Sequence, residues 1–221
     1  MSTTNNNEKQ ALSKACKVTT GLGIISYAYL TEPREDDNGT LKYSTSFLIP
    51  KSDKKTLINI KNAINAAAQI GLEDKWGGKL PDPLKLPLRD GDKEADEKGE
   101  EYRGCYFLNA NSTRKPRIVD LNIQDILDPD EIYSGCKCRL SLNFYPFNIK
   151  GSKGVAAGLN NVQKIEDGEP LGGTRSKAED DFADMSDLDL SFDEPGDTAA
   201  PVKLAAKKGD DILNGINFDA A

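Results

Sequence analysis

The sequence predicts a mainly β protein: a small antiparallel barrel with one helix, followed by a disordered acidic C-terminal tail. Three observations predict this organisation. Segments rich in β-branched and aromatic residues recur along the first 165 residues, one segment has helical periodicity, and the composition changes after residue 173. Strands and helices do not alternate regularly, which argues against a parallel doubly wound sheet.

The chain begins with a polar segment, residues 1–16, which we expect to be flexible. A first strand is predicted at 18–30, and a turn rich in Pro, Asp, Asn and Gly follows at 32–40. The second strand, 41–49, alternates apolar and polar residues, as a strand with one buried face does. These segments predict two strands joined by a turn.

The one predicted helix spans residues 53–70. Leu57 and Ile60 belong to its apolar face, and Gly71 is expected to end it. Pro- and Gly-rich and charged segments follow up to residue 101, and they are predicted to be loops. Further strand signals lie at 102–112, 114–120, 136–149 and 154–165. Five or six curved strands with one helix between them fit a small barrel such as an OB-fold, over residues 17–173.

Composition argues against several functional classes. The 221 residues include no histidine, which excludes Ser-His-Asp and Cys-His catalysis and His-ligated zinc. No P-loop is present, and the acids at 90–101 lack the glycine that a calcium loop requires. No apolar run approaches the roughly 20 residues of a membrane span, and no secretory signal begins the chain. We therefore predict no enzyme, no cofactor and no membrane contact.

The four cysteines are the remaining candidates for a metal site or disulfides. They are Cys16, Cys105, Cys136 and Cys138. The pair at 136–138 has CxC spacing and lacks a second pair to complete a tetrahedral zinc site, although zinc remains the alternative. We expect four reduced cysteines, half-buried on strands, and no bound metal.

The charge is distributed unevenly. Residues 1–165 contain 24 Lys and Arg against 21 Asp and Glu, whereas residues 166–221 contain 5 against 15. The last part also has few large apolar residues, so residues 174–221 are predicted to be a disordered interaction tail. Its isolated aromatic residues are expected to bind partners: Phe182, Phe192 and Phe218. The alternative is that the acidic tail only maintains solubility.

The strand at 136–149 carries the strongest binding signal. Its even positions from 138 to 144 are apolar, whereas its odd positions are Lys137, Arg139, Ser141, Asn143, Tyr145 and Phe147. Cations for phosphates, rings for stacking and amides for polar base edges are the mixture that a single-strand binder uses. The alternative is a solvated sheet face with a homodimer contact at Tyr145 and Phe147.

A second segment, 102–117, repeats this mixture of cations, aromatic rings and amides. Both parities of this segment carry aromatic residues, so either Tyr106 or Phe107 must be buried. Candidate contacts beyond the strand at 136–149 are Lys42, Trp76, Lys79, Arg103, Tyr106, Arg114, Lys115 and Arg117. For the basic cluster at 114–117, an ordinary exposed turn is an equal alternative.

Several stretches together resemble a family of tailed-phage single-stranded DNA-binding proteins with an OB-fold. In order from residue 17 to residue 182 they are GLGIISYAYL, KYSTSFLIPKSDK, KWGGKLP, PLRDGD, YRGCYFLNANS, KPRIVD, IYSGCKCRLSLNFYPFN, KGVAAGLNNVQKIEDGEPLGG and EDDF. The resemblance implies a non-enzymatic body that coats single-stranded DNA during replication and recombination, in the cytoplasm of an infected bacterial host. It also implies an acidic tail that contacts replication partners.

One departure from the family concerns the docking tip of that tail. Many such proteins end in acids plus a terminal aromatic residue, whereas this chain ends in NFDAA, so the segment 179–193 is the alternative docking segment. A second functional class also stays open. In it the chain is a protein–protein adaptor or a structural phage protein, and the aromatic face is an oligomer interface.

Overall fold

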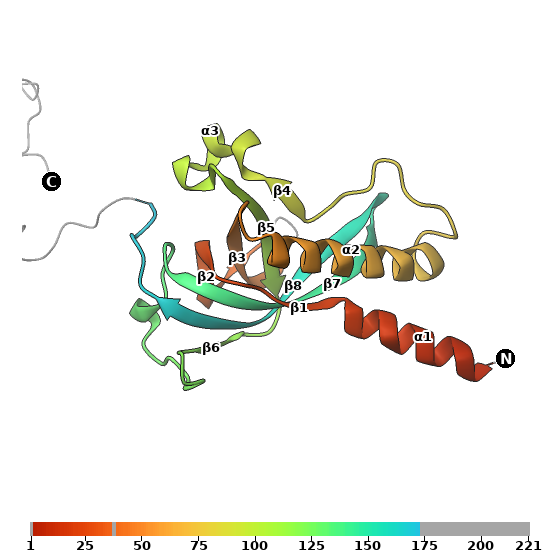
Figure 1. Cartoon of the computed structure of the whole chain (residues 1–221), viewed down its shortest axis with the longest axis horizontal. Coiled ribbons are helices and arrows are strands. Elements are labelled where there is room, and N and C mark those ends of the chain that lie inside the picture. The colour runs from red at the N-terminus through yellow and green to blue at the C-terminus, as the bar shows by residue number, and fades with distance from the viewer. Residues whose placement is uncertain (1, 37–38, 173–221) are drawn as a thin grey trace, which may run out of the picture. The chain divides into compact units, whose positions relative to one another are not determined.

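The computed structural model describes residues 2–36 and 39–172 (Figure 1). These residues form eight strands, three α-helices and three short 3-10 turns. The predicted mainly β fold with few helices is therefore confirmed. The predicted tail, 174–221, lies outside the described residues. None of the helices in the described part is long and apolar enough to cross a membrane.

Five long strands pair in a closed cycle, which we call the ring. They are β2 (Gly23–Glu35), β3 (Leu41–Pro50), β5 (Cys105–Ser112), β7 (Lys137–Ile149) and β8 (Ser152–Glu166). The cycle runs β2, β3, β5, β8, β7 and back to β2. The β5–β8 pair is parallel, and the other pairs of the ring are antiparallel. Segments far apart in the sequence thereby surround one interior.

Three strands of three residues each extend the ring. β1 (Lys17–Thr19) pairs with β7, β4 (Leu88–Asp90) with β5, and β6 (Arg117–Val119) with β8. The β7–β8 hairpin turns tightly at Lys150 and Gly151, which both have positive φ values of 49° and 82°. That conformation suits a two-residue turn between twisted antiparallel strands.

The central helix α2 spans Lys54–Asp74 and packs against β7 (Figure 1). The Asp53 carboxylate caps it by accepting a hydrogen bond from the Thr56 amide at 3.0 Å. The helix continues past Gly71, where the sequence predicted its end. A Cβ on Gly71 would lie 2.8 Å from the Trp76 ring, so this glycine makes room for packing instead.

A helix also replaces the expected flexible N-terminus. α1 spans Ser2–Ala15, and the Lys9 ammonium lies 2.9 Å from the Asp74 carboxylate at the end of α2. Leu12 packs against the main core. The ion pair with Asp74 and the packing of Leu12 on the core thus hold this segment in place, which the polar composition alone did not indicate.

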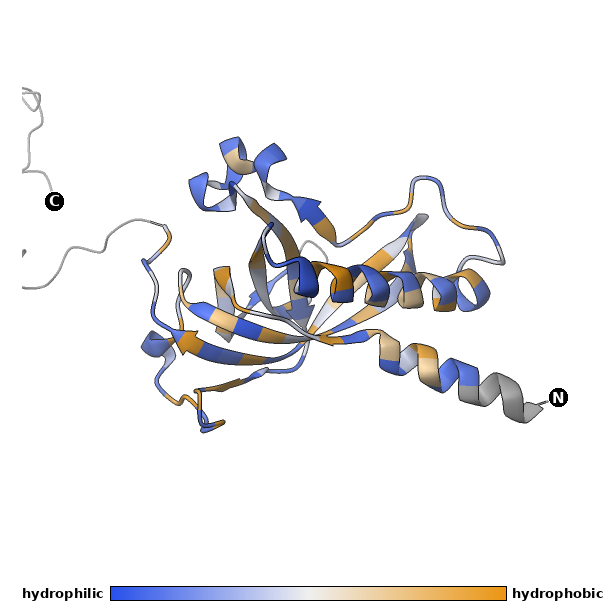
Figure 2. Cartoon of the chain, in the orientation of Figure 1, coloured by the Kyte–Doolittle hydropathy of each residue, from blue (hydrophilic) through white to orange (hydrophobic). Residues whose placement is uncertain are grey.

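The buried hydrophobic residues form two clusters on opposite sides of β3 and β5. Figure 2 shows how hydrophobic and hydrophilic residues alternate along the strands. Alternate residues of these strands, such as Phe47 and Leu108, point into the ring and toward α2. Leu48 and Phe107 point the other way, and they pack outside the ring beneath residues 91–104. We call residues 91–104 the cap segment.

The cap segment consists of η1 (Gly91–Lys93), α3 (Ala95–Lys98) and η2 (Glu100–Tyr102). Tyr102 is fully buried, and its ring meets the Phe107 ring edge-on with centroids 4.9 Å apart. Its hydroxyl donates a hydrogen bond to Ser46 Oγ at 3.0 Å. Because these turns occupy the segment up to Tyr102, β5 begins three residues later than the sequence predicted.

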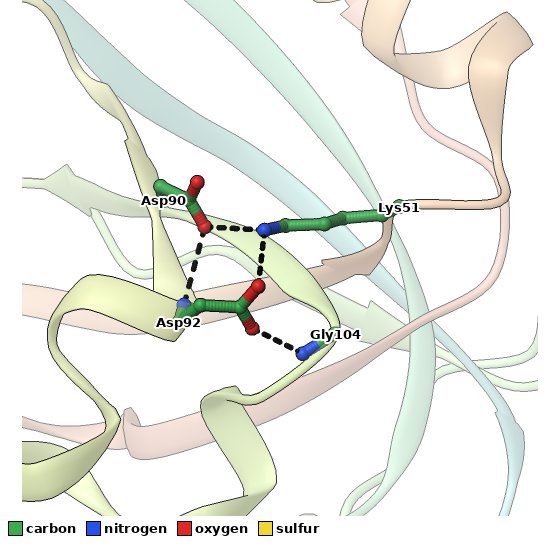
Figure 3. A network of polar contacts seen from close by, with 4 residues as sticks. All are labelled: Lys51, Asp90, Asp92 and Gly104. Carbon is green, nitrogen blue, oxygen red and sulfur yellow. Dashed lines mark hydrogen bonds and ion pairs between the residues drawn. The ribbon is translucent and has the colours of Figure 1, made fainter.

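A polar network fastens the cap segment to the ring (Figure 3). The Lys51 ammonium lies 2.6 Å from a carboxylate oxygen of Asp90 and 2.6 Å from one of Asp92. The Gly104 amide donates to the other oxygen of Asp92 at 2.6 Å. Hydrogen bonding to Lys51 lowers the pKa of both carboxyls, so both stay ionised at neutral pH.

The four cysteines are free thiols, and all except Cys105 are buried. Burial raises the pKa of Cys138 to about 12. Among the described residues, no three His, Cys, Asp or Glu side chains gather as a metal site requires. In the structure Cys136 and Cys138 are therefore part of the core packing.

Candidate nucleic-acid interface

A groove runs over the outer surface of β2, β3, β5 and β8. It consists of three adjoining hollows, and neighbouring hollows share residues: Tyr27, Tyr29 and Lys98 between the first two, and Asn109 between the second and the third. The first hollow reaches Leu171 and Gly172, and the third reaches Lys85 and Phe147. We call this continuous depression the groove.

Small polar side chains form the middle of the groove. Ser44 and Ser46 of β3 pair in register with Asn111 and Asn109 of β5. They point outward because the residues between them point into the core. Ser46 is buried, so the groups that this part of the groove offers are the Ser44 hydroxyl and the amides of Asn109 and Asn111.

Two tyrosines line one end of the groove. Tyr27 is 48% exposed and has a φ of 49°, which is rare for a bulky residue. The register of β2 against β3 shifts between Ser26 and Tyr29, and the Ala28 amide donates to Ser134 Oγ at 3.0 Å. Ile25 and Leu30 both lie in the core, so this irregularity reverses the alternation between them and places Tyr27 and Tyr29 on the outer face, where both line the same hollow. An accessible aromatic ring is the group on which a nucleic-acid base stacks.

Cations stand beside these rings. The Arg34 guanidinium lies 5.3 Å from the centre of the Tyr29 ring and donates to the Tyr29 hydroxyl at 3.2 Å. Lys98 reaches the same hollow from the cap segment. Further along, the Arg89 guanidinium covers the Phe107 ring at 4.3 Å and pairs with Glu94 at 3.1 Å. The groove thus combines aromatic rings, cations and hydrogen-bonding groups.

The strand parity predicted for β7 is confirmed. Cys138, Leu140, Leu142 and Phe144 are buried, so the odd positions face outward. Tyr145 is 39% exposed, and a Cβ on Gly158 would lie only 3.4 Å from its ring. The ring therefore lies against the outer surface of β8 at a glycine. Asn143 pairs in register with this same glycine.

The two cations predicted on β7 do not line the groove. The Lys137 ammonium lies 2.9 Å from the Glu166 carboxylate, and Arg139 Nε donates to the Thr20 carbonyl at 3.1 Å. Both side chains are thus engaged within the protein. Their contact with nucleic acid stays a prediction.

The other predicted cations are scattered. Lys42 pairs with Asp36, and Arg103 pairs with Glu100 and Asp96. Arg117 pairs with Asp125 and lines a separate hollow together with Lys115. Arg114 is exposed next to that region, and Lys79 is exposed in the loop after α2. The structure does not bring these residues together in the groove.

The predicted contact at Trp76 needs correction, whereas the one at Tyr106 stays a prediction. Trp76 is only 4% exposed, and its Nε1 donates to the Phe147 carbonyl at 3.1 Å. The ring is part of the core and has no free face for a base. Tyr106 is half-buried against the core with the Lys51 ammonium 5.1 Å from its ring centre. Of the pair Tyr106 and Phe107, Phe107 is the fully buried one.

Sequence reasoning missed Tyr27, Tyr29, Arg34 and Lys98. Tyr27 and Tyr29 lie in the first predicted strand, and Arg34 follows them within β2. That combination of rings and a cation could have identified this end of the groove. No sequence signal placed Lys98 there, because its position depends on how the cap segment folds.

A family model and a known phage protein both match most of this chain. A family model described as Enterobacter phage Enc34, ssDNA-binding protein matches residues 16–191. Putative protein p50 of Acyrthosiphon pisum secondary endosymbiont phage 1 is 33% identical over 174 residues, which cover 73% of this chain and 90% of that protein.

Solved structures are similar as well. The single-stranded DNA-binding protein from bacteriophage Enc34 in complex with ssDNA has a TM-score of 0.60 at 27% identity, covering 72% of this chain and 91% of that one. For gp2.5, a single-stranded DNA-binding protein encoded by bacteriophage T7, the TM-score is 0.51 at 18% identity, with coverage of 83% and 98%. The latter likeness shows a shared fold.

Proposed function

Since this chain belongs to the Enc34 family of phage single-stranded DNA-binding proteins, we propose that the groove is where it binds single-stranded DNA. The observation that carries this proposal is that the three hollows adjoin one another from Tyr27 to Phe147. In OB-folds the face of the second and third strands binds oligonucleotides, and β3 and β5 hold these positions in the ring.

The groove residues favour binding that does not depend on base sequence. Tyr27 and Tyr29 can stack on any base, since every base has a π-face. Arg34 and Lys98 can neutralise phosphates, which is a sequence-independent contribution. The serine and asparagine side chains in the middle of the groove can accept or donate hydrogen bonds with several bases. The protein would thereby coat and protect single strands in phage replication and recombination, without catalysis, in the cytoplasm of the infected host.

We also propose that the acidic tail regulates this binding. The tail, 174–221, lies outside the described residues, but Leu171 and Gly172 line the first hollow of the groove. The acidic stretch from Glu179 to Glu194 begins seven residues later in the sequence. Tethering gives such a segment a high effective concentration near the cations, so it would compete with DNA phosphates.

Displacement of the tail by DNA would then make its apolar residues available. Phe182, Phe192 and Phe218 are the residues that we expect to contact a replication or recombination protein. The tail would couple DNA coating to partner recruitment. A plain solubility role is the alternative, and the two differ in what truncation does to DNA affinity.

Titration with oligo(dT) tests the proposed function. Binding should quench tyrosine fluorescence, and the affinity should fall as the salt concentration rises. Tyr27→Ala combined with Tyr29→Ala should weaken it strongly. An adaptor or structural protein would show no such titration. If the double variant bound oligo(dT) as the parent does, the groove would not be the binding site.

Truncation after Gly173 tests the tail proposal separately. The truncated protein should bind oligo(dT) more tightly than the full chain, with the largest difference at low ionic strength, where screening is weakest. It should lose contact with tail-dependent partners while it keeps the fold. Equal or weaker affinity of the truncated protein at low salt would refute competition by the tail.

A further inference from the structure

The loop after α2 and the β7–β8 hairpin lie next to each other beyond the third hollow of the groove (Figure 1). We call residues 75–87 and 148–153 together the lysine end. These residues contain a single acid, Asp82. They contain five cations: Lys75, Lys79, Lys85, Lys150 and Lys153. This local excess of positive charge contrasts with the overall negative charge of the chain.

Backbone and side-chain hydrogen bonds fasten the loop to the hairpin. The Lys85 amide donates to the Lys153 carbonyl at 3.2 Å, and the Val155 amide donates to the Lys85 carbonyl at 2.9 Å. A Cβ on Gly154 would lie 2.3 Å from that same Lys85 carbonyl oxygen. The two chain segments therefore touch through their backbones.

The other end of the loop is fastened as well. Trp76 Nε1 donates to the Phe147 carbonyl at 3.1 Å, and Asn148 Nδ2 donates to the Lys75 carbonyl at 3.2 Å. With contacts at both ends, the loop holds its lysines at defined places beside the hairpin. The backbone of the lysine end is therefore ordered by its own hydrogen bonds.

The lysine charges are not neutralised within the described part of the chain. None of the five ammonium groups has a carboxylate within ion-pair distance there, whereas Lys51, Arg103 and Lys137 all do. Positive charge that has no counterion on one stretch of surface attracts an anion. The most suitable ligand is therefore a polyanion.

The lysine end continues the groove. Lys85 and Leu86 line the third hollow, next to Arg89. Leu80, Leu86 and Ile149 are 62%, 50% and 61% exposed, and they offer apolar contacts to sugars and base faces between the cations. In OB-folds the loop that joins the last two strands takes part in oligonucleotide binding, and the β7–β8 turn holds that position.

We propose that the lysine end binds the phosphates of the same single strand that fills the groove, and so extends the site beyond the third hollow. This inference rests on the proposed function. It identifies where the strand leaves the groove and predicts that affinity depends on strand length. Nucleotides beyond those held in the groove contribute through Lys79, Lys150 and Lys153.

The test compares two triple variants of the full chain. One carries Lys79→Ala, Lys150→Ala and Lys153→Ala. The control carries Lys54→Ala, Lys55→Ala and Lys61→Ala, which removes the same charge from α2, where the three lysines are exposed and line none of the three hollows. Affinities for oligo(dT) of about 4 to about 16 nucleotides, the range that one OB-fold covers, are measured against salt concentration.

For the longest oligonucleotide, the lysine-end variant should lose about 2 from the slope of log affinity against log salt, because each lost single-strand phosphate contact removes about 0.7. For the shortest, which only the groove holds, it should bind as the parent does. Equal slopes in the parent and this variant at every length, or an equal loss in the control, would overturn the extension. Failure of the parent to bind any length would instead overturn the proposed function.

Discussion

Two neighbouring parts of one surface serve different purposes on β3 and β5. Leu48 pairs in register with Phe107, and both are fully buried beneath the cap segment. Two residues along each strand, Ser46 pairs with Asn109, and both line the groove, where Asn109 is exposed and Ser46 is buried at the boundary with the covered part. All four point away from the ring interior. The covered part stabilises the protein, whereas the open part is available to a ligand.

The role of each part of this outer face therefore depends on whether the cap segment packs on it. The cap segment covers the apolar part and contributes Lys98 to the open part. The hydrogen bond from the Tyr102 hydroxyl to Ser46 Oγ joins the two parts. Variants on either side of this boundary should therefore separate stability from DNA binding.

The largest effect is expected on the covered side. Phe107→Ala removes a fully buried ring from the cluster under the cap segment and should lower the free energy of unfolding by about 3–5 kcal/mol. Asn109→Ala, two residues away on the open side, should change it by no more than about 0.5 kcal/mol. Denaturant unfolding of both variants measures the contrast. Similar losses in the two variants would contradict the division of this surface.

At the tyrosine end of the groove, a substitution should weaken DNA binding and leave the stability of the fold unchanged. Tyr29→Ala should cost about 1–3 kcal/mol of oligo(dT) binding, because a stacked base loses its platform. Tyr29→Phe keeps the ring and should retain most of the affinity. Fluorescence titration gives the affinities, and a melting curve shows that the fold is kept. If Tyr29→Phe lost as much affinity as Tyr29→Ala, the hydroxyl and not stacking would carry the interaction.

A smaller effect is expected at the boundary between the two parts. Tyr102→Phe keeps the buried ring but removes the hydroxyl that donates to Ser46. Its unfolding free energy should fall by about 0.5–1.5 kcal/mol, the usual net contribution of one hydrogen bond. Ser46→Ala removes the acceptor, so the double variant should lose less than the sum of the two single losses. If the loss in the double variant equalled the sum of the two single losses, the hydrogen bond between Tyr102 and Ser46 would not contribute to stability.

The smallest expected effect is on how the stability of the protein depends on pH. Lys51 lowers the pKa of Asp90 and Asp92, so their contribution to stability is present above the unfolded pKa of about 3.9 and is lost as the pH falls through the folded values. Lys51→Met should therefore be less stable than the parent near neutral pH, and the difference should shrink below about pH 4. Melting temperatures across this range measure it. A difference that persisted at pH 2 would point to packing.

Alternation along single strands could be read from the sequence. The buried even positions of β7 and the apolar face of α2 follow from local periodicity. The choice between Tyr106 and Phe107 could not, because both faces of β5 bury aromatic residues, one inside the ring and one beneath the cap segment. The cap segment, which covers Phe107, contains only short helical turns, so its own sequence shows no periodicity that would predict this burial.

Long-range contacts explain the other differences from the sequence predictions. Trp76 lies in a Pro- and Gly-rich loop that is typical of an exposed segment, yet its indole reaches the Phe147 carbonyl, 71 residues further along the chain. Tyr27 depends on a positive φ within a register shift, which strand propensity does not indicate. Four of the eight predicted cations are in ion pairs within the described part of the chain, and such pairing is invisible until the fold is known.

The closed cycle of strand pairing affects how readily copies of the protein aggregate. A sheet with an open edge can template growth onto another chain, which leads to aggregation. Here each of the five long strands has a neighbour on both sides, and the strands at the ends of the sheet order, β1 and β6, are three residues long. A protein that coats long strands is needed in many copies, side by side. The ring leaves β3 and β5, which form the middle of the groove, with strand neighbours on both sides, so neighbouring copies find no free backbone edge there.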